Sequence, residues 1–400
     1  MNAVDALVIG AGPAGATAAL ALARAGLVVA VAERATFPRR KVCGEFISAT
    51  TWPLLRRLGV ARDLLPAAGP PVRRVGFYCG DAIVHAPMPA PDDADAWGRA
   101  LGREHLDLAL LDAAVRTGAR LWQPWSVEAC EVGRDVCRVT LVERGGRRSE
   151  LHARVVVAAH GSWERSALAT QSARPRARDS DLFGFKAHLR STRLPPESMP
   201  LVLFPGGYGG LVASDAGRTS FSCCIRRDAL RRCRVAYPGR PAGESVLAHA
   251  MVTCAGVRAA LAGAGREGVW LSAGPIRPGV RRAANGRVFA AGNAAGEAHP
   301  LVAEGISMAI QSGWLLAGEL VGARELSDDA LRAAGERYAR AWRDNFLART
   351  RVSSAFAALM LAPATRAASA ALLARVPGVL TLGARFSGKA ATLHSPAPST

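Results

Sequence analysis

The chain has 400 residues, half of them hydrophobic, which is long enough for two or three packed units rather than one simple core. Its formal net charge is +19, but the basic residues are spread without a run of five, and aromatic residues make up only 6% of the sequence. We therefore expect no nucleic-acid partner, because such proteins usually gather basic and base-stacking side chains on one surface.

The cysteines and apolar stretches bear on metal content and compartment. The eight cysteines form no C-x-x-C pair, so we expect no metal site, and a large chain without a secretory signal favours a reducing, cytoplasmic location. The apolar stretch 355–382 is cut by Arg366, Arg375 and Pro377, so no transmembrane segment is expected. The basic surface leaves peripheral membrane contact open, and both monomer and homodimer stay open.

The N-terminal segments predict a strand, a helix and a second strand. Residues 4–9 are an apolar run, residues 13–26 are alanine-rich with helical spacing, and residues 27–32 are apolar and β-branched, ending at Glu33. Elements in this order form a βαβ unit with a parallel sheet.

Strand-like and helical segments then alternate along the chain. Two strands around a Cys-Gly-Asp turn are predicted at 73–86, several strands at 181–226, and a helix at 326–350 with Tyr338, Trp342 and Phe346 on one face. The other predicted elements are a helix at 103–117, strands within 119–145 and at 154–159, a helical region at 243–264, a strand at 287–291 and a helix at 301–322.

This order predicts an α/β fold in which insertions interrupt a nucleotide-binding sheet. We expect a discontinuous nucleotide-binding domain from residues 1–72, 97–165 and 271–325. The inserted, mainly antiparallel substrate-binding domain takes residues 73–96 and 166–270. A C-terminal helical region covers 326–400, and its tail from about residue 393 is expected to fray.

A glycine motif in the first βαβ unit predicts dinucleotide binding. Residues 10–15 fit G-x-G-x-x-G between a predicted strand and a predicted helix. Gly10 permits the tight turn, Gly12 lets the backbone approach a pyrophosphate, and Gly15 lets helix and strand pack closely. The phosphates would sit at the helix N-terminus, and Glu33 would accept hydrogen bonds from a ribose.

Three later motifs favour FAD over NAD. They are Arg39-Arg40-Lys41-Val42-Cys43-Gly44-Glu45, Arg103-Glu104-His105-Leu106-Asp107, and Ala291-Gly292-Asn293-Ala294-Ala295-Gly296 followed by His299-Pro300 and Glu304-Gly305-Ile306. With these motifs the chain, to about residue 350, resembles the flavoprotein superfamily of p-hydroxybenzoate hydroxylase, the geranylgeranyl reductases and the flavin-dependent halogenases. The resemblance implies a Rossmann-like FAD-binding domain of the glutathione reductase type.

The resemblance also implies roles for individual residues. Asn293 stands where the family has an acidic residue on the ribityl chain, and its amide oxygen can still accept. His160, before Gly161, replaces the acid of the family's A-D-G motif. Arg103 is expected at the phosphates or ribose, and the Val127 backbone at adenine. The expected cofactor-binding residues are Gly10, Gly12, Pro13, Ala14, Gly15, Ala16, Glu33, Arg34, Arg40, Lys41, Val42, Cys43, Gly44, Arg103, Val127, Gly161, Gly292, Asn293, Pro300, Gly305 and Ile306.

The substrate pocket is expected between the flavin and the inserted sheet. Aromatic residues predicted to line it are Phe183, Phe185, Phe204 and Tyr208. If Phe183 and Phe185 face the pocket, strand alternation turns Lys186 and His188 away from it.

Two residues are candidates for a chemical role. His299 lies on a loop near the expected flavin and is a candidate acid or base, with a loop-structuring role as the alternative. Cys43 lies in the Lys41–Gly44 stretch, which is most like the reductase and halogenase branches, and a small residue packed at a turn is its alternative role.

These features predict an FAD-dependent oxidoreductase acting on a small lipophilic substrate. The first hypothesis is an NAD(P)H-dependent monooxygenase, a hydroxylase or epoxidase, for an aromatic or polyketide-like secondary metabolite. The alternative is a C=C reductase of the geranylgeranyl reductase type, favoured by residues 41–44. A halogenase is a lesser alternative, because Leu201–Pro205 stands where tryptophan-type halogenases have W-x-W-x-I-P. A non-catalytic flavin-fold binding protein stays as a lesser alternative.

Overall fold

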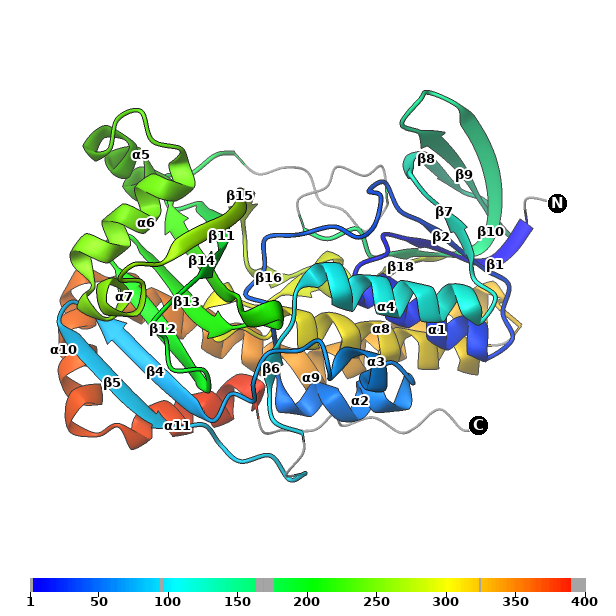
Figure 1. Cartoon of the computed structure of the whole chain (residues 1–400). Helices are drawn as coiled ribbons and strands as arrows, with labels where there is room; N and C mark the ends of the chain where they lie inside the picture. Colours follow the sequence, from blue (N-terminus) through cyan, green and yellow to red (C-terminus); the bar gives the residue numbers. More distant parts are fainter. Residues whose placement is uncertain (1–2, 94–95, 163–167, 169–175, 324, 390–400) are drawn as a thin grey trace.

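The computed structural model describes residues 3–93, 96–162, 168, 176–323 and 325–389. A nucleotide-binding unit contains the N-terminal strand, a second unit contains a separate sheet, and the C-terminal helices run along one side of both (Figure 1). The α/β class and the Rossmann-like architecture with an inserted, mainly antiparallel sheet are confirmed.

The nucleotide-binding unit is built on an eight-stranded sheet with a parallel core. The main strand order is β17-β18-β10-β1-β2-β7, and β9 and β8 extend it from β10 as antiparallel strands. The strands are β1 (Ala3–Ile9), β2 (Val29–Ala32), β7 (Arg120–Trp122), β8 (Trp125–Val132), β9 (Cys137–Glu143), β10 (Arg148–Ala158), β17 (Ala284–Asn285) and β18 (Val288–Ala290). Leu7 and Val8 at the centre of β1 are fully buried, as expected for a parallel strand between packed layers.

Three helices cover one face of this sheet. Helix α1 (Pro13–Arg24) packs between α4 (Arg103–Arg116) and α8 (Gly305–Gly322), and the three lie side by side in Figure 1. A Cβ atom at Gly15 would lie 1.9 Å from the carbonyl oxygen of Gly10, so only glycine allows the helix to start this close to β1. Short elements connect the layers: β3 (Phe46–Ile47), η1 (Ala49–Thr51), α2 (Trp52–Arg57), α3 (Ala61–Leu64), β6 (Arg99–Ala100), β16 (Gly279–Val280), η3 (Gly292–Ala294), β19 (Gly296–Glu297) and η4 (Pro300–Val302).

The second unit is a seven-stranded sheet in the order β15-β11-β14-β13-β12-β4-β5. All neighbours are antiparallel except β12 and β4. The strands are β4 (Arg74–Cys79), β5 (Ala82–Pro87), β11 (Leu182–Arg190), β12 (Ser198–Phe204), β13 (Gly207–Ala213), β14 (Thr219–Arg226) and β15 (Gly265–Ile276), with η2 (Asp215–Gly217) between β13 and β14. Helices α5 (Arg227–Ala236), α6 (Ala242–Thr253) and α7 (Ala255–Ala260) cover one face.

Strand β15 corrects the expected domain boundary between residues 270 and 271. It continues to Ile276, which pairs with Leu182 of β11, so residues 271–276 belong to the second sheet. The register between β15 and β11 shifts twice, between Leu182 and Gly184 and between Lys186 and His188, as at a β-bulge. The helical region expected at 243–264 is also divided, because extended backbone at Cys254 separates α6 from α7.

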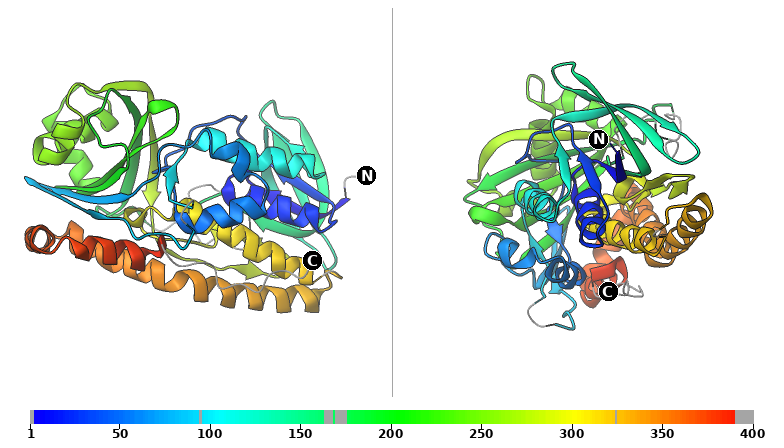
Figure 2. Two further views of the ribbon diagram at one scale, coloured as in Figure 1. Left: turned by 60° about the horizontal axis from the view of Figure 1, so that its bottom comes forward. Right: turned by 90° about the vertical axis from the view of Figure 1, so that its right-hand side faces the viewer.

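The C-terminal helices close the molecule along one side. They are α9 (Asp328–Leu361), α10 (Pro363–Arg375), α11 (Gly378–Ala384) and the final turn η5 (Arg385–Lys389). Figure 2 shows α9 extending beneath both units. Tyr338, Trp342 and Phe346 share a buried face, as predicted, while the tail expected to fray from residue 393 lies outside the described residues.

No single helix among the described residues has the length and apolar composition needed to cross a membrane. One bent pair, α9 with residues 364–375 of α10, meets both criteria together, with a bend of 103°.

Candidate active site

A cavity of about 1200 Å³ lies between the two sheets and the C-terminal helices. We call the lining residues from the nucleotide-binding unit the cofactor wall, and those from the second sheet and residues 348–387 the apolar wall. Nineteen of the expected cofactor residues lie on the cofactor wall: Gly10, Gly12, Pro13, Ala14, Glu33, Arg34, Arg40, Lys41, Val42, Cys43, Gly44, Arg103, Val127, Gly161, Gly292, Asn293, Pro300, Gly305 and Ile306. Gly15 and Ala16 are buried behind it in α1.

The N-terminus of α1 is suited to a pyrophosphate. Gly12 is the N-cap, Pro13 follows it, and the first turn has no acidic residue, so the free backbone N–H groups face no competing carboxylate. A Cβ atom at Gly12 would lie 3.6 Å from the Arg103 guanidinium, which places a cation beside the turn. Both oxygens of Asp107 accept hydrogen bonds from Arg103 at 2.7 Å and fix its orientation.

The carboxylate of Glu33 is held at the end of β2. Its Oε2 accepts from the Ala11 backbone N–H at 2.8 Å, and its Oε1 accepts from the Ala35 N–H at 2.9 Å. These bonds hold an acidic side chain at the ribose position of the fingerprint, and both Glu33 and Val127 line the cavity.

The segment 292–305 forms the other end of the cofactor wall. Gly292 adopts φ of +60° and donates its N–H to Ser312 Oγ at 2.8 Å. The Asn293 amide donates to Glu297 Oε1 at 2.9 Å, which leaves its oxygen as the acceptor needed for a ribityl contact. Helix α8 begins at Gly305 with no acidic residue in its first turn. Glycine turns, two helix N-termini and the Glu33 carboxylate together fit FAD.

Two histidines lie near this site in neutral form. Burial lowers the pKa of His160, which lines the cavity, and of His299 to about 4 each. His299 does not line the cavity. Its ring packs against Tyr208 with the centroids 5.1 Å apart, and its backbone N–H donates to Ser353 Oγ at 3.1 Å.

Cys43 and Glu45 lie where the cofactor wall meets the second sheet. Cys43 lines the cavity, its Sγ accepts from the Glu45 backbone N–H at 3.4 Å, and its thiol interacts with the Arg103 guanidinium. Glu45, fully buried at φ of +64°, contacts Lys186 and accepts from His188 Nε2 at 2.8 Å. Burial raises the pKa of Glu45, but His188 and Lys186 outweigh it and lower the pKa to about 2.

The Glu45–Lys186–His188 cluster corrects the predicted orientation of β11. Lys186 and His188 point toward the cofactor-binding unit, while Phe185 packs in the cluster under α5–α7 and the Arg227 guanidinium lies over the ring of Phe183. Phe204 belongs to the same cluster as Phe185, so of the four predicted aromatic residues only Tyr208 lines the cavity. The alternation of side chains along β11 separated its two faces correctly. Both faces are buried, however, so the hydrophobicity of their residues did not identify the face that points toward the site.

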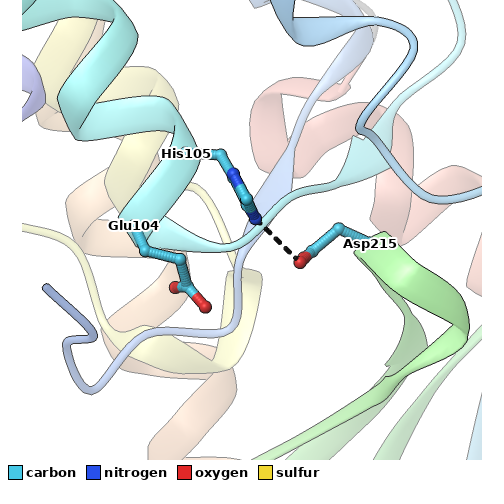
Figure 3. Close-up of side chains that lie close together, drawn as sticks. All are labelled: Glu104, His105 and Asp215. Atoms are coloured by element: carbon cyan, nitrogen blue, oxygen red, sulfur yellow. Dashed lines mark ion pairs between the residues drawn. The ribbon is translucent and has the colours of Figure 1, made fainter. Parts of the chain in front are cut away.

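Glu104, His105 and Asp215 form a separate polar group that joins α4 to η2 (Figure 3). His105 Nε2 lies 3.3 Å from Asp215 Oδ2. Arg218 contacts both carboxylates, lying 3.1 Å from Glu104, and Arg40 lies 3.2 Å from Glu104. Because two arginines already neutralise these acids, we assign the group to ion pairing between the units.

The apolar wall differs in chemistry from the cofactor wall. Its large apolar members are Val75, Met199, Leu201, Tyr208, Leu211, Val212, Leu271, Ile276, Val352, Phe356, Leu359, Met360, Leu372, Leu373, Val379, Leu380 and Phe386. Among the described residues, Arg349 is its only charged member, and the buried Nη1 of Arg349 has no hydrogen-bond partner.

Curated relatives of the chain include reductases. A menaquinone reductase of Mycobacterium tuberculosis is 36% identical over 120 residues, which is 30% of this chain and 29% of that protein. The chain therefore matches less than a third of the length of that relative. A digeranylgeranylglycerophospholipid reductase 2 of Methanopyrus kandleri is 27% identical, over 86% of this chain and 83% of that protein.

Solved structures share the fold across most of the chain. A myxobacterial chondrochloren halogenase superposes with a TM-score of 0.74 at 22% identity, covering 86% of this chain and 80% of that one. This likeness concerns the fold alone. The FAD binding domain family matches residues 3–343, and the chain belongs to that family, as a member of the FAD-dependent oxidoreductases.

Proposed function

We propose that this protein is an FAD-dependent reductase that saturates a C=C bond of a lipophilic substrate, with Cys43 as the proton donor. The observation that carries the proposal is the position of the Cys43 thiol on the cavity lining, between the cofactor wall and the apolar wall. The two reductases among the relatives support the same class of reaction. The monooxygenase hypothesis has no comparable side chain in its favour at this position.

In this proposal, bound FAD supplies a hydride equivalent and the chain supplies the rest of the reaction. The apolar wall would hold the alkene and exclude water. One alkene carbon would receive the hydride, and Cys43 would transfer its proton to the other alkene carbon. The product therefore gains one hydride and one proton. The nearby Arg103 guanidinium would stabilise the resulting thiolate until solvent reprotonates it.

The apolar wall also limits the substrate class. A wall of this composition favours an extended hydrocarbon or polyprenyl chain. The unpartnered Nη1 of Arg349 favours one anionic or electron-rich oxygen on that substrate, because a buried guanidinium N–H group without a hydrogen-bond partner is costly.

An anaerobic assay tests the reaction class. Chemically reduced enzyme is mixed with polyprenyl quinones and isoprenoid lipids in the absence of dioxygen, and products are analysed by mass spectrometry. We expect a product with two added hydrogens and a fall in rate of at least tenfold in Cys43→Ala at unchanged flavin content. An absolute requirement for dioxygen, with one added oxygen in the product, would overturn the reductase proposal.

The second candidate is an NAD(P)H-dependent monooxygenase. It is favoured by the neutral state of His160 and His299 and by the extent of the apolar wall, because oxygen transfer requires a site from which water is excluded. NADH and NADPH, as proposed reductants for either reaction, are compared by the rate at which each bleaches the flavin with substrate present.

A further inference from the structure

We propose that the C-terminal helices dock on the surface of an anionic lipid bilayer and that the cavity receives its ligand through this face. The docking face consists of six exposed apolar side chains: Leu359, Leu372, Val376, Val379, Leu382 and Phe386. They come from α9, α10, α11 and η5, which lie together along one side of the molecule (Figure 2). The proposal does not depend on which reaction the flavin performs.

The exposure of these side chains is large for a water-facing surface. Phe386 is 68% exposed, Leu372 53% and Leu382 52%. Single exposed leucines are common, but these side chains come from neighbouring helices and four of them line one cavity, and such a group indicates a surface that another phase or molecule covers.

The docking face is continuous with the cavity. Leu359, Leu372, Val379 and Phe386 both belong to the face and line the cavity. The opening therefore lies among side chains that favour hydrocarbon, and an apolar ligand could pass from a bilayer to the apolar wall without crossing water.

The charge around the face identifies the partner. Residues 345–389 contain six basic residues and no acidic residue. Arg375 and Arg385 are exposed and directly precede Val376 and Phe386 of the docking face. A second copy of the chain would bring like charges together at this face, whereas an anionic membrane attracts them. Apolar side chains bordered by arginines are the usual composition of a surface that lies on a bilayer.

The helices would lie on the bilayer rather than cross it. Helix α9 buries Tyr338, Trp342 and Phe346 against the nucleotide-binding unit. The exposed residues on this part of the helix, among them Glu336, Arg337 and Arg343, are charged, so it offers no apolar face to lipid. The lipid contact is therefore limited to the end of α9 and to residues 363–387.

Vesicle flotation tests the proposal with the full-length flavoprotein. We expect it to float with vesicles of phosphatidylcholine and phosphatidylglycerol, less with phosphatidylcholine alone, and to be partly released by salt. Val376→Ser with Leu382→Ser, neither on the cavity lining, should weaken the partition coefficient about tenfold, since both apolar contacts are lost. Arg375→Gln and Arg385→Gln should each weaken it about fivefold on anionic vesicles only.

The matched control is Val235→Ser with Val252→Ser, on α5 and α6. Both valines are at least as exposed, at 82% and 68%, but lie on helices that cover the other face of the second sheet. This variant should bind vesicles like wild type, and flavin absorbance verifies that each variant is folded. Three outcomes would overturn the proposal. They are an equal loss of vesicle binding in both double variants, no binding of the wild type to any vesicle, and a homodimer that the Val376 and Leu382 substitutions dissociate.

Discussion

The two walls of the cavity are stabilised in different ways. The cofactor wall is made of backbone turns and side chains whose hydrogen bonds are fixed within the protein, such as Glu33 on Ala11 and Ala35 and Arg103 on Asp107. The apolar wall is made of side chains from the second sheet and from α9 to η5, and Arg349 is the single charged residue among its described members. A fixed wall suits one cofactor, whereas an apolar wall selects its ligand by shape and hydrophobicity. The predictions that follow test this division.

The largest effect is expected at the junction of the two walls, in Glu45→Gln. This change leaves Lys186 and His188 buried without their acid, so we expect the free energy of unfolding to fall by about 3–5 kcal/mol. The control Glu128→Gln removes a surface pair with Arg148 and should leave the denaturation midpoint unchanged. Comparable midpoints for the two variants would show that the buried cluster adds no stability.

The pH dependence of the Glu45 contribution has a defined sign. Its folded pKa of about 2 is below the model-compound value of 4.5, so the stabilisation is complete above pH 4.5 and is lost as the pH falls toward 2. The free energies of unfolding of wild type and of Glu45→Gln, measured by denaturation over this range, should therefore approach each other as the pH falls toward 2.

The next effect concerns His299. Its pKa of about 4 in the folded protein is below the ordinary 6.5, so its neutral form stabilises the fold above pH 6.5 and the contribution is lost between pH 6.5 and 4. His299→Gln should remove up to about 3 kcal/mol of the acid-induced loss of stability. His152→Gln, at a half-buried surface position on β10, is the matched substitution of a second histidine.

The cofactor wall is tested by Gly15→Ala. The added methyl would overlap the carbonyl oxygen of Gly10, and the adjustment should cost about 1–3 kcal/mol of FAD affinity, measured by flavin release. Gly318→Ala in α8 meets no atom within 4 Å and should retain flavin like wild type. Equal flavin retention in the two variants would argue against the tight start of α1.

The smallest effect is expected on the apolar wall, in Arg349→Met. If Arg349 contacts an oxygen of the substrate, KM should rise about tenfold at unchanged FAD affinity, which is the value of roughly one charged hydrogen bond. Arg351→Met, an exposed position two residues further along α9, is the control. A fall in FAD affinity instead of a rise in KM would show that Arg349 acts in binding FAD, as the residues of the cofactor wall do.

The sequence predicted the cofactor wall better than the apolar wall, and the reason is physical. The motif around Gly10 and Gly12 depends on local backbone geometry, which a short stretch of residues determines. The contact between Glu45 and Lys186 joins residues 141 positions apart, and no local pattern reports it. The prediction for Phe183 and Phe185 was wrong because helices α5–α7 bury the opposite face of the sheet as well.

Helix α9 has a consequence for how new specificities could arise. At about 50 Å for 34 residues, it is a single brace: Tyr338 donates to Ala290 of β18, and Met360 packs in the cluster under the second sheet. The two units therefore cannot separate like a hinge without breaking that brace. Residues 363–387 follow α9 as a separate segment that supplies part of the apolar wall. Evolution or protein engineering could exchange this segment to change the ligand while the residues of the cofactor wall stay the same.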